Sequence, residues 1–316
     1  LLDSNDTTPL VSGLAQKINA SSPTGYSALE LGDGLTVTVG NVQYGLTLGS
    51  GSSTPAGLSY DPATSRWQLD LSAATPLAQG VYDVAVSVSA VGYATPKTDI
   101  SSGELVIKTD PPVLSMQSLA GDDRLNLVES QGSITVSGTA QDMVPGTSTN
   151  TAVGRTLGLT LGGKSYTTTA VAADGSWTVL LPAADVAALT QTSYGVQLSY
   201  AGIYGNNASA SRSLLVDLLR PALPNAALSQ DTGTAETPAV TADPSLDAPS
   251  NTEAQATLQY RLIRNDGTPS AWQGSYSAPA TDGTADGSYQ VQLRQLDQAR
   301  NVSDVQTVRF MLDTKA

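Results

Sequence analysis

The stretch Asp174-Gly-Ser-Trp-Thr-Val-Leu-Leu181 opens with a turn signal and continues as an apolar, β-branched run. Its Asp-Gly pair favours a hairpin turn, because glycine readily adopts the positive backbone torsion that such a turn requires. Further along, Tyr194-Gly-Val-Gln-Leu-Ser-Tyr200 alternates apolar and polar residues with the period of a strand. The chain as a whole is rich in Thr, Val and Tyr and contains 29 Gly and 17 Pro, so we predict an all-β protein.

The same landmarks occur three times along the 316 residues. Each occurrence combines a tryptophan with a tyrosine that starts a strand about 16 residues later, a fixed spacing that indicates an internal repeat. The pairs are Trp67 with Tyr82, Trp177 with Tyr194, and Trp272 with Tyr289. Aspartates near apolar strands recur at intervals of roughly 100 residues, the size of one domain. These aspartates are Asp6, Asp110, Asp217 and Asp313.

This repeat predicts three tandem immunoglobulin-like β-sandwich domains, covering residues 1–110, 111–217 and 218–316. Seven or so short strands in about 100 residues are typical of such sandwiches, and a tyrosine entering a late strand is similar to their tyrosine corner. We expect the three tryptophans in the sandwich cores, with an exposed sugar-stacking platform as the alternative. One short helix is expected over Pro182-Ala-Ala-Asp-Val-Ala-Ala-Leu189, because proline is favourable in a first helical turn.

The composition excludes several classes of function. The chain has no His and no Cys, which removes Ser-His-Asp and Cys-His catalysis, thiolate–imidazole zinc sites and disulfides. Its 15 Lys and Arg against 28 Asp and Glu give a net charge of −13, which disfavours nucleic acid and anionic membranes and favours cations. No apolar run reaches the roughly 20 residues of a membrane span, and no signal peptide is visible, so we expect a mature or excised segment.

Catalysis is not expected. A pair of carboxylates suffices for glycoside hydrolysis, but no such pair stands out from the acidic residues that serve turns. Sandwiches of about 100 residues also offer little cleft for a substrate. We therefore expect a protein that is not an enzyme.

Several motifs resemble a known family. The middle unit contains Gly121-Asp-Asp-Arg-Leu-Asn126, Ile134-Thr-Val-Ser-Gly138 and Asp174-Gly-Ser-Trp-Thr-Val179, and the third contains Asp286-Gly-Ser-Tyr289 and Arg294-Gln-Leu-Asp-Gln-Ala-Arg-Asn-Val-Ser303. These motifs resemble the bacterial immunoglobulin-like (Big-type) tandem repeats of giant secreted adhesins, the biofilm-associated and RTX-type surface proteins. The first unit is similar to a more divergent member. The resemblance implies extracellular, rod-forming sandwiches on the bacterial cell surface, often rigidified by structural calcium near their junctions.

The first candidate calcium site lies near the first junction. Calcium takes six to eight oxygen ligands from carboxylates, amides and carbonyls. The expected ligands are the linker residue Asp110 and four residues of one following loop, Asp122, Asp123, Asn126 and Glu129. They converge if the first strand of the middle unit returns this loop towards the linker. The alternative is a solvated acidic loop in which Asp122-Asp123 forms a turn.

A second candidate set surrounds the second junction. Its expected ligands are Asp217, Asp231 and Asp243, with Glu236 nearby. Against calcium here, Arg220 would place positive charge beside the ion. The surrounding segment is also consistent with a long flexible entry into the third unit.

A third candidate pair is Asp297 and Asn301, which match an Asp-x-x-x-Asn loop of the family. We expect this loop to face any repeat that follows. The alternative is an Asx-turn at a hairpin.

These observations favour an extender, or stalk, of a surface adhesin whose partners are neighbouring repeats of the same chain. It is expected to bind no nucleic acid and to insert into no membrane. One alternative is a subunit of a surface layer or filament that contacts like subunits. Another is a carbohydrate-binding module, for which the tyrosines of the first unit are the best candidates: Tyr26, Tyr44, Tyr60 and Tyr93.

Overall fold

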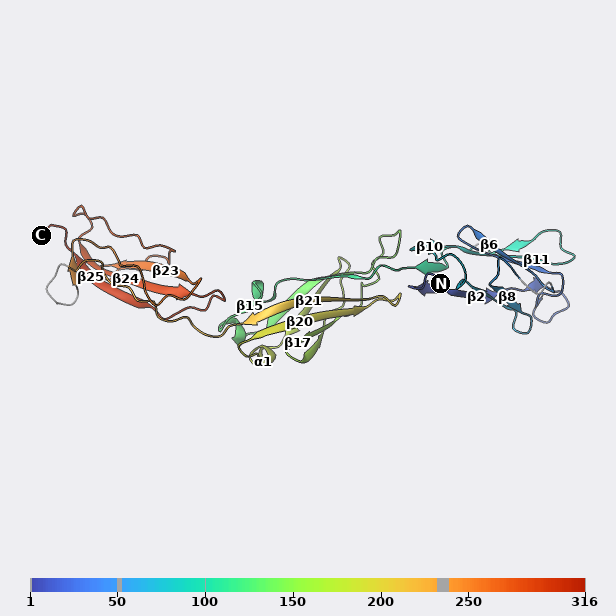
Figure 1. Ribbon diagram of the computed structural model, residues 1–316, viewed down its shortest axis with the longest axis horizontal. Helices are drawn as coiled ribbons and strands as arrows, with labels where there is room; N and C mark the ends of the chain where they lie inside the picture. Colours follow the sequence, from blue (N-terminus) through green and yellow to red (C-terminus); the bar gives the residue numbers. More distant parts are fainter. Residues whose placement is uncertain (1, 50–52, 100, 232–238, 316) are drawn as a thin grey trace.

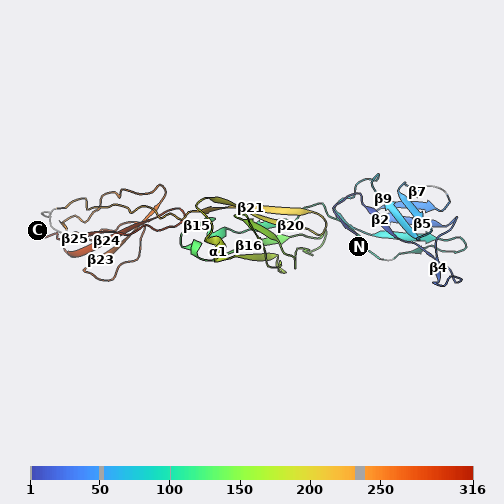
Figure 2. The ribbon, with the colours of Figure 1, turned by 90° about the horizontal axis from the view of Figure 1, so that it is seen from below.

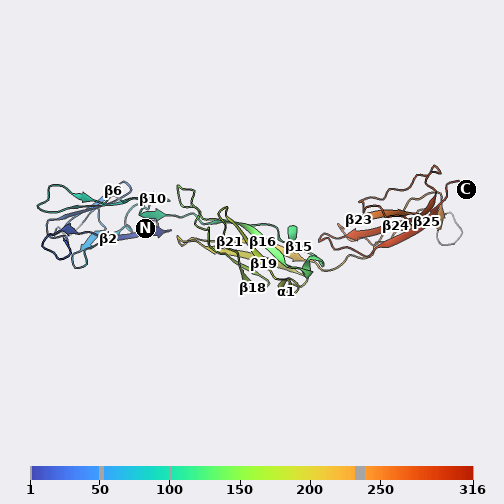
Figure 3. The same ribbon diagram turned by 180° about the vertical axis from the view of Figure 1, so that it is seen from behind.

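The computed structural model describes residues 2–49, 53–99, 101–231 and 239–315. The three units follow one another along the long axis in sequence order (Figure 1). Views turned by 90° and 180° show the same row (Figures 2 and 3), so the units lie end to end. The all-β prediction is confirmed, and we propose unit boundaries near residues 110 and 217.

The first unit is a sandwich of short strands. They are β1 (Leu2–Ser4), β2 (Leu10–Leu14), β3 (Lys17–Ile18), β4 (Tyr26–Ser27), β5 (Gly34–Val39), β6 (Val42–Thr47), β7 (Ser53–Thr54), β8 (Leu58–Asp61), β9 (Arg66–Asp70), β10 (Gly80–Tyr82), β11 (Val84–Ser89), β12 (Lys97–Thr98) and β13 (Leu105–Ile107). In the described residues the sheet orders are β2-β9-β8, β12-β11-β5-β6-β7 and β1-β13-β10, while β3 pairs with β4. The core between the sheets includes Val37, Trp67 and Leu69, since these side chains alternate inward.

The middle unit is the most regular of the three. Its elements are β14 (Val113–Met116), η1 (Leu119–Gly121), β15 (Arg124–Leu125), η2 (Glu129–Gln131), β16 (Ile134–Gln141), β17 (Gly158–Leu161), β18 (Lys164–Thr167), β19 (Ser176–Leu181), α1 (Ala183–Val186), β20 (Ser193–Ala201) and β21 (Asn207–Val216). Its sheets, β14-β16-β19 and β15-β21-β20-β17-β18, enclose one apolar core. The predicted helix is confirmed as α1, which begins after Pro182 but is shorter than the predicted range and ends at Val186. No helix in the described ranges is long and apolar enough to cross a bilayer.

The third unit departs from the predicted strand number. Its strands are β22 (Ala239–Thr241), β23 (Thr257–Arg264), β24 (Gly287–Leu296) and β25 (Gln306–Leu312). Where residues are described, these form one sheet of order β22-β25-β24-β23, and isolated bridges such as Leu228–Leu246 join the facing segments. The prediction of about seven strands is therefore wrong here. Pro224, Pro244 and Pro249 lie in those segments, and proline has no N–H to donate to a ladder.

A glycine faces the core tryptophan in each of the first two units. Gly13 pairs with Trp67 across β2 and β9, and Gly138 pairs with Trp177 across β16 and β19. A Cβ atom at Gly138 would lie 2.0 Å from the Ser115 carbonyl oxygen and 2.6 Å from the Trp177 ring. Both tryptophans are buried in the cores, as predicted.

Trp272 does not follow this pattern. It is only partly buried, and it lies outside the core of the third unit. The guanidinium carbons of Arg261 and Arg294 lie 4.5 and 4.1 Å from its ring centre. The prediction of a core position is wrong for this residue, because the ring lies beside the arginines of β23 and β24 rather than between sheets.

The tyrosine corner occurs in all three units. Each tyrosine hydroxyl forms a hydrogen bond with the backbone of the residue four positions upstream, which ties the start of a late strand to the preceding loop. Tyr82 and Tyr289 donate to the carbonyls of Ala78 and Ala285, at 2.8 and 2.6 Å. Tyr194 accepts from the Thr190 N–H at 2.9 Å. The predicted resemblance to an immunoglobulin-like corner is thus confirmed.

Replacing Gly138 with alanine is expected to destabilise the middle unit by about 3 kcal/mol, because the new methyl group overpacks the core beside Trp177. Scanning calorimetry of the whole chain measures the effect. The matched control is Gly195→Ala in β20, where a Cβ atom would have no neighbour within 4 Å. Equal losses in the two variants would contradict a steric role for Gly138.

Candidate functional site: the two junctions

A buried ion pair crosses the first junction. Lys108 immediately follows β13, and its Nζ atom lies 2.9 Å from Oδ1 of Asp142, which follows β16 of the middle unit. The two side chains are 4% and 1% exposed. The side chain that directly follows the last strand of the first unit is therefore bound inside the middle unit.

The other carboxylate oxygen of Asp142 is held by hydroxyl groups. Thr151 Oγ1 donates to Oδ2 at 2.9 Å, and the Tyr200 hydroxyl donates to it at 3.4 Å. Burial raises the pKa of Tyr200, and the charge of Asp142 raises it further, so the hydroxyl remains a donor. The carboxylate thus has one cationic and two neutral partners.

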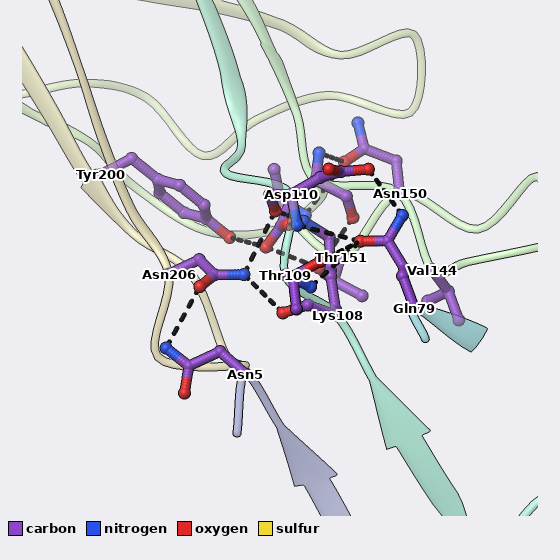
Figure 4. A network of polar contacts seen from close by, with 12 residues as sticks. Asn5, Gln79, Lys108, Thr109, Asp110, Val144, Asn150, Thr151, Tyr200 and Asn206 are labelled. Atoms are coloured by element: carbon purple, nitrogen blue, oxygen red, sulfur yellow. Dashed lines mark hydrogen bonds and ion pairs between the residues drawn. The ribbon is translucent and has the colours of Figure 1, made fainter. Parts of the chain in front are cut away.

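Two amide side chains hold the backbone of the same linker (Figure 4). Asn206 Nδ2 donates to the carbonyls of Lys108 and Asp110, at 2.7 and 3.1 Å. Asn5 of the first unit in turn donates to Asn206 Oδ1 at 3.1 Å. From the first unit, Gln79 Oε1 accepts the Asp110 N–H at 2.9 Å, and its Nε2 donates to Oδ2 of Asp110 at 2.6 Å.

The second junction uses the same asparagine contact. Asn301 Nδ2 donates to the carbonyl of Asp217, at 2.8 Å, and its Oδ1 accepts the Leu127 N–H, also at 2.8 Å. The loops that carry the two asparagines match: Gly202 N–H donates to the Asn206 carbonyl, and Asp297 N–H donates to the Asn301 carbonyl. Asn206 and Asn301 are therefore equivalent positions.

The charges at equivalent positions differ between the junctions. Lys108 follows the last strand of its unit, whereas Asp217 follows the last strand of the middle unit. Gly202 occupies the position that Asp297 occupies in the third unit. Asp297 is 7% exposed and has no ion-pair partner among the described residues; both its oxygens accept N–H groups of Asn301. The second junction consequently contains buried negative charge, and the first contains a neutral pair.

The expected convergence of Asp110 with the loop from Asp122 to Glu129 is wrong. β15 pairs in parallel with the end of β21, which carries the loop to the opposite end of the middle unit. There Leu127 contacts Asn301, and Arg124 donates to Gln298 of the third unit at 2.9 Å. The Asp110 carboxylate instead binds Gln79 at the first junction.

Most polar groups of this loop already have partners within the chain. Asp122 Oδ1 accepts the Arg124 N–H, and Asp123 Oδ1 accepts Arg212 Nε at 2.6 Å. Asn126 Oδ1 accepts the Glu129 N–H at 2.9 Å, while Glu129 Oε2 accepts the Asn126 N–H at 3.1 Å. This reciprocal pattern, which has the spacing Asn-x-x-Glu of a capping box, closes the turn that leads into η2.

The remaining predicted ligands fall into two groups. Asp243 binds the N–H and hydroxyl of Ser245 beside β22, at the end of the third unit far from Asp217, and Asp231 lies near it. Asp297 and Asn301 face the middle unit rather than a following repeat, so that expectation is wrong. Glu236 lies outside the described residues. In the described ranges no group of three or more carboxylates forms a metal-binding cluster.

Sequence reasoning missed Lys108, Asp142, Asn206 and Gln79. A signal existed for Lys108, since it follows Leu105-Val-Ile107 at the position where Asp217 follows Leu214-Leu-Val216. No local pattern identifies Asp142, because its partner lies in another unit.

The tyrosines of the first unit do not form one platform. Tyr44 is buried in the core, and the Tyr60 hydroxyl binds the Ala15 carbonyl. Tyr26 and Tyr93 are 54% and 56% exposed and line one cavity of about 300 Å³. The half-buried Tyr60 lines a separate cavity of about 760 Å³, so the accessible tyrosines are divided between two cavities.

Asp123 is expected to make stability depend on pH. Burial raises its pKa, but Arg212 and the Leu119 N–H outweigh burial and hold the pKa below its ordinary value of 3.8. The resulting stability is present above pH 3.8 and is lost as pH falls through the lower folded value. Asp123→Asn should therefore lower the melting temperature at pH 7 and match wild type in strong acid. Arg212→Gln should weaken the pH dependence of the melting temperature in the same acid range. If a variant and the wild type differed in melting temperature by the same amount at every pH, this assignment would be contradicted.

Asn301→Ala is expected to loosen the second junction while leaving the first unchanged, because one side chain supplies the bonds to Leu127, Asp217 and Asp297. Small-angle scattering of the whole chain should show a less extended molecule. Asn19→Ala is the control, since Asn19 Oδ1 accepts the Ser21 N–H within the first unit. Equal scattering curves for the two variants would count against the role of Asn301.

No protein-family model matches the chain, and no curated protein matches it significantly. Among solved structures, a 1.5-MDa bacterial ice-binding adhesin is 19% identical, with 98% of this chain and 92% of that chain covered and a TM-score of 0.43. A Ca²⁺-stabilized ice-binding adhesin of an Antarctic bacterium is 21% identical over 99% and 70%, with a TM-score of 0.36. A bacterial immunoglobulin-like domain from the M. primoryensis ice-binding adhesin is 31% identical over 34% and 98%, with a TM-score of 0.25. The similar solved structures thus include bacterial immunoglobulin-like adhesin domains, the family that the sequence resembles.

Proposed function

We propose that this chain is a non-catalytic, extracellular stalk segment of a bacterial surface adhesin, which supports cell adhesion or biofilm formation by holding a binding region away from the cell. The observation that carries the proposal is the row of sandwiches whose two linkers are both fixed by side chains of the adjoining units. Its immediate partners are the neighbouring repeats of the same protein.

The first linker is too short and too well bound to act as a hinge. Only residues 108–112 separate β13 from β14, and Pro111 and Pro112 have fixed φ angles. The backbone of Asp110 is bound from both sides, by Gln79 and by Asn206. Such a linker transmits direction from one unit to the next, which a stalk requires.

Calcium, as a structural ion, is proposed for the second junction alone. The groups there are oxygen donors of the kind that suits calcium: Asn301 binds the Asp217 carbonyl and the Asp297 carboxylate, and the Asp217 carboxylate accepts Gln191 Nε2 at 3.2 Å. The Asp297 carboxylate is buried, and no cationic side chain among the described residues pairs with it. A bound ion would supply the missing positive charge and tie the third unit to the linker.

A rod-shaped monomer is expected in solution. Small-angle scattering should give the distance distribution of an extended particle, and sedimentation should give the mass of one chain. A compact globule would refute the stalk. Polymerisation would favour a subunit of a surface layer or filament, and hits on a glycan array would favour a carbohydrate-binding module that uses Tyr26 and Tyr93.

Adding calcium is expected to stabilise the third unit. Extracellular modules bind calcium with dissociation constants of roughly 10⁻⁴–10⁻³ M. At a free concentration about 100 times the constant, one site adds about 2.7 kcal/mol. The Asp217→Asn, Asp297→Asn double variant should lose this gain, whereas Asp231→Asn, Asp243→Asn, at the far end of the unit, should keep it. Calorimetric melting curves of the wild type and of the two double variants, recorded in EDTA and in calcium, measure the gain. If the wild-type curves in EDTA and in calcium were identical, the calcium site would be refuted.

A further inference from the structure

We propose that Lys108 is the permanent cation of the first junction, so that this junction is held rigid without a metal ion. The proposal concerns the first linker only. It does not depend on whether the second junction binds calcium, nor on the surface to which the stalk belongs.

The position of Lys108 supports this assignment. Each linker begins with the residue that follows the last strand, and the carbonyl of that residue accepts an asparagine amide of the next unit. That residue is Lys108 at the first junction and Asp217 at the second. A position that supplies a carboxylate in one junction therefore supplies an ammonium group in the other.

Three groups surround the ammonium group of Lys108, which has three N–H bonds: a carboxylate, a carbonyl and an aromatic ring. Lys108 Nζ pairs with Asp142 Oδ1 at 2.9 Å and donates to the Asp110 carbonyl. The ring centre of the buried Tyr204 lies 6.0 Å from Nζ, within the range of a cation–π contact. Carboxylate and carbonyl oxygens are also the groups that a calcium ion would use, but here the lysine already occupies them.

The first junction differs from the second at another position besides that of Lys108. Gly202 lies where the third unit has Asp297, and a Cβ atom at Gly202 would lie 2.9 Å from Asp142 Oδ2 and 2.8 Å from the Asn206 carbonyl. The first junction therefore has no room for the second aspartate. The single carboxylate of Asp142 balances the single charge of Lys108, and a divalent ion beside the ammonium would be repelled.

Because the ion pair is buried, forming it costs desolvation free energy, and it forms in only one orientation of the two units. Two charges are removed from water, and the cost is repaid only when the geometry and the additional hydrogen bonds are good. Oδ1 of Asp142 has a partner only when the first unit places Lys108 beside it, so a bent or rotated linker leaves a buried charge without its cation. The pair thus favours one orientation of the two units.

The test uses the whole chain, which has no native cysteine and can be spin-labelled at chosen sites. Labels at the exposed positions Ser59 and Gln197 report on the first junction, and labels at Gln197 and Thr257 report on the second. In the wild type, the Ser59–Gln197 distance distribution should be equally narrow in EDTA and in calcium. Broadening in EDTA would overturn the proposal, whatever the Gln197–Thr257 pair shows.

Lys108→Met should broaden the Ser59–Gln197 distribution and leave the Gln197–Thr257 distribution unchanged. Exchange of the Asn206 side-chain amide, which binds the linker carbonyls across the junction, should become faster by on the order of 100-fold, because the junction opens to hydrate Asp142. The matched control is Lys164→Met, which removes an exposed lysine paired with Asp185 within the middle unit and should change neither distribution. A Lys108→Met distribution as narrow as that of wild type would overturn the proposal.

Chemical rescue separates the charge from a folding defect. Lys108→Ala leaves a space beside Asp142, and ethylammonium chloride should narrow the Ser59–Gln197 distribution again, whereas sodium chloride at equal ionic strength should not. Equal effects of the two salts would show that no cation site exists there. The double variant Lys108→Met, Asp142→Leu removes both charges, so its Ser59–Gln197 distribution should be narrower than that of Lys108→Met alone. A broader distribution in the double variant would contradict the role of the ion pair.

Discussion

At both junctions an asparagine amide of the following unit binds the backbone carbonyl that ends the preceding unit. Asn206 binds the Lys108 carbonyl and Asn301 binds the Asp217 carbonyl, at 2.7 and 2.8 Å. A carbonyl at this point has left the β-ladder and must find another donor if water is excluded. The next unit supplies that donor, and the direction of each unit therefore follows from the one before it.

A fixed linker can hold two units in one relative orientation only if each unit is itself rigid. The first two units gain rigidity from large core side chains packed against glycine, as in the Gly138–Trp177 pair, and from tyrosine corners that fasten a loop to a strand. The third unit has a smaller buried core and fewer regular strands in its described part. It depends correspondingly more on its junction, where Asn301 and Asp297 are buried.

The two junctions solve one electrostatic problem in different ways. Oxygen-rich surfaces that meet away from water need positive charge between them. The first junction carries this charge on Lys108, whose side chain reaches Asp142 of the next unit. At the second, Arg300 lies 4.0 Å from Asp122 across the junction, but among the described residues no cationic side chain pairs with Asp217 or Asp297. Two junctions of the same repeat architecture thus differ in the charges that they bury.

The sequence by itself determined the all-β class, the tandem plan, the helix after Pro182 and the tyrosine corners, because strand periodicity, turn chemistry and regular spacing are local or repeated signals. It also marked Asp217, Asp297 and Asn301 as candidate ligands. Only the tertiary structure placed these three together and moved the Asp122–Glu129 loop away from Asp110, since the parallel pairing of β15 with β21 decides which end of the unit receives that loop. The Lys108–Asp142 pair was equally hidden, because its partners lie in different units and neither position has a pattern that specifies the other.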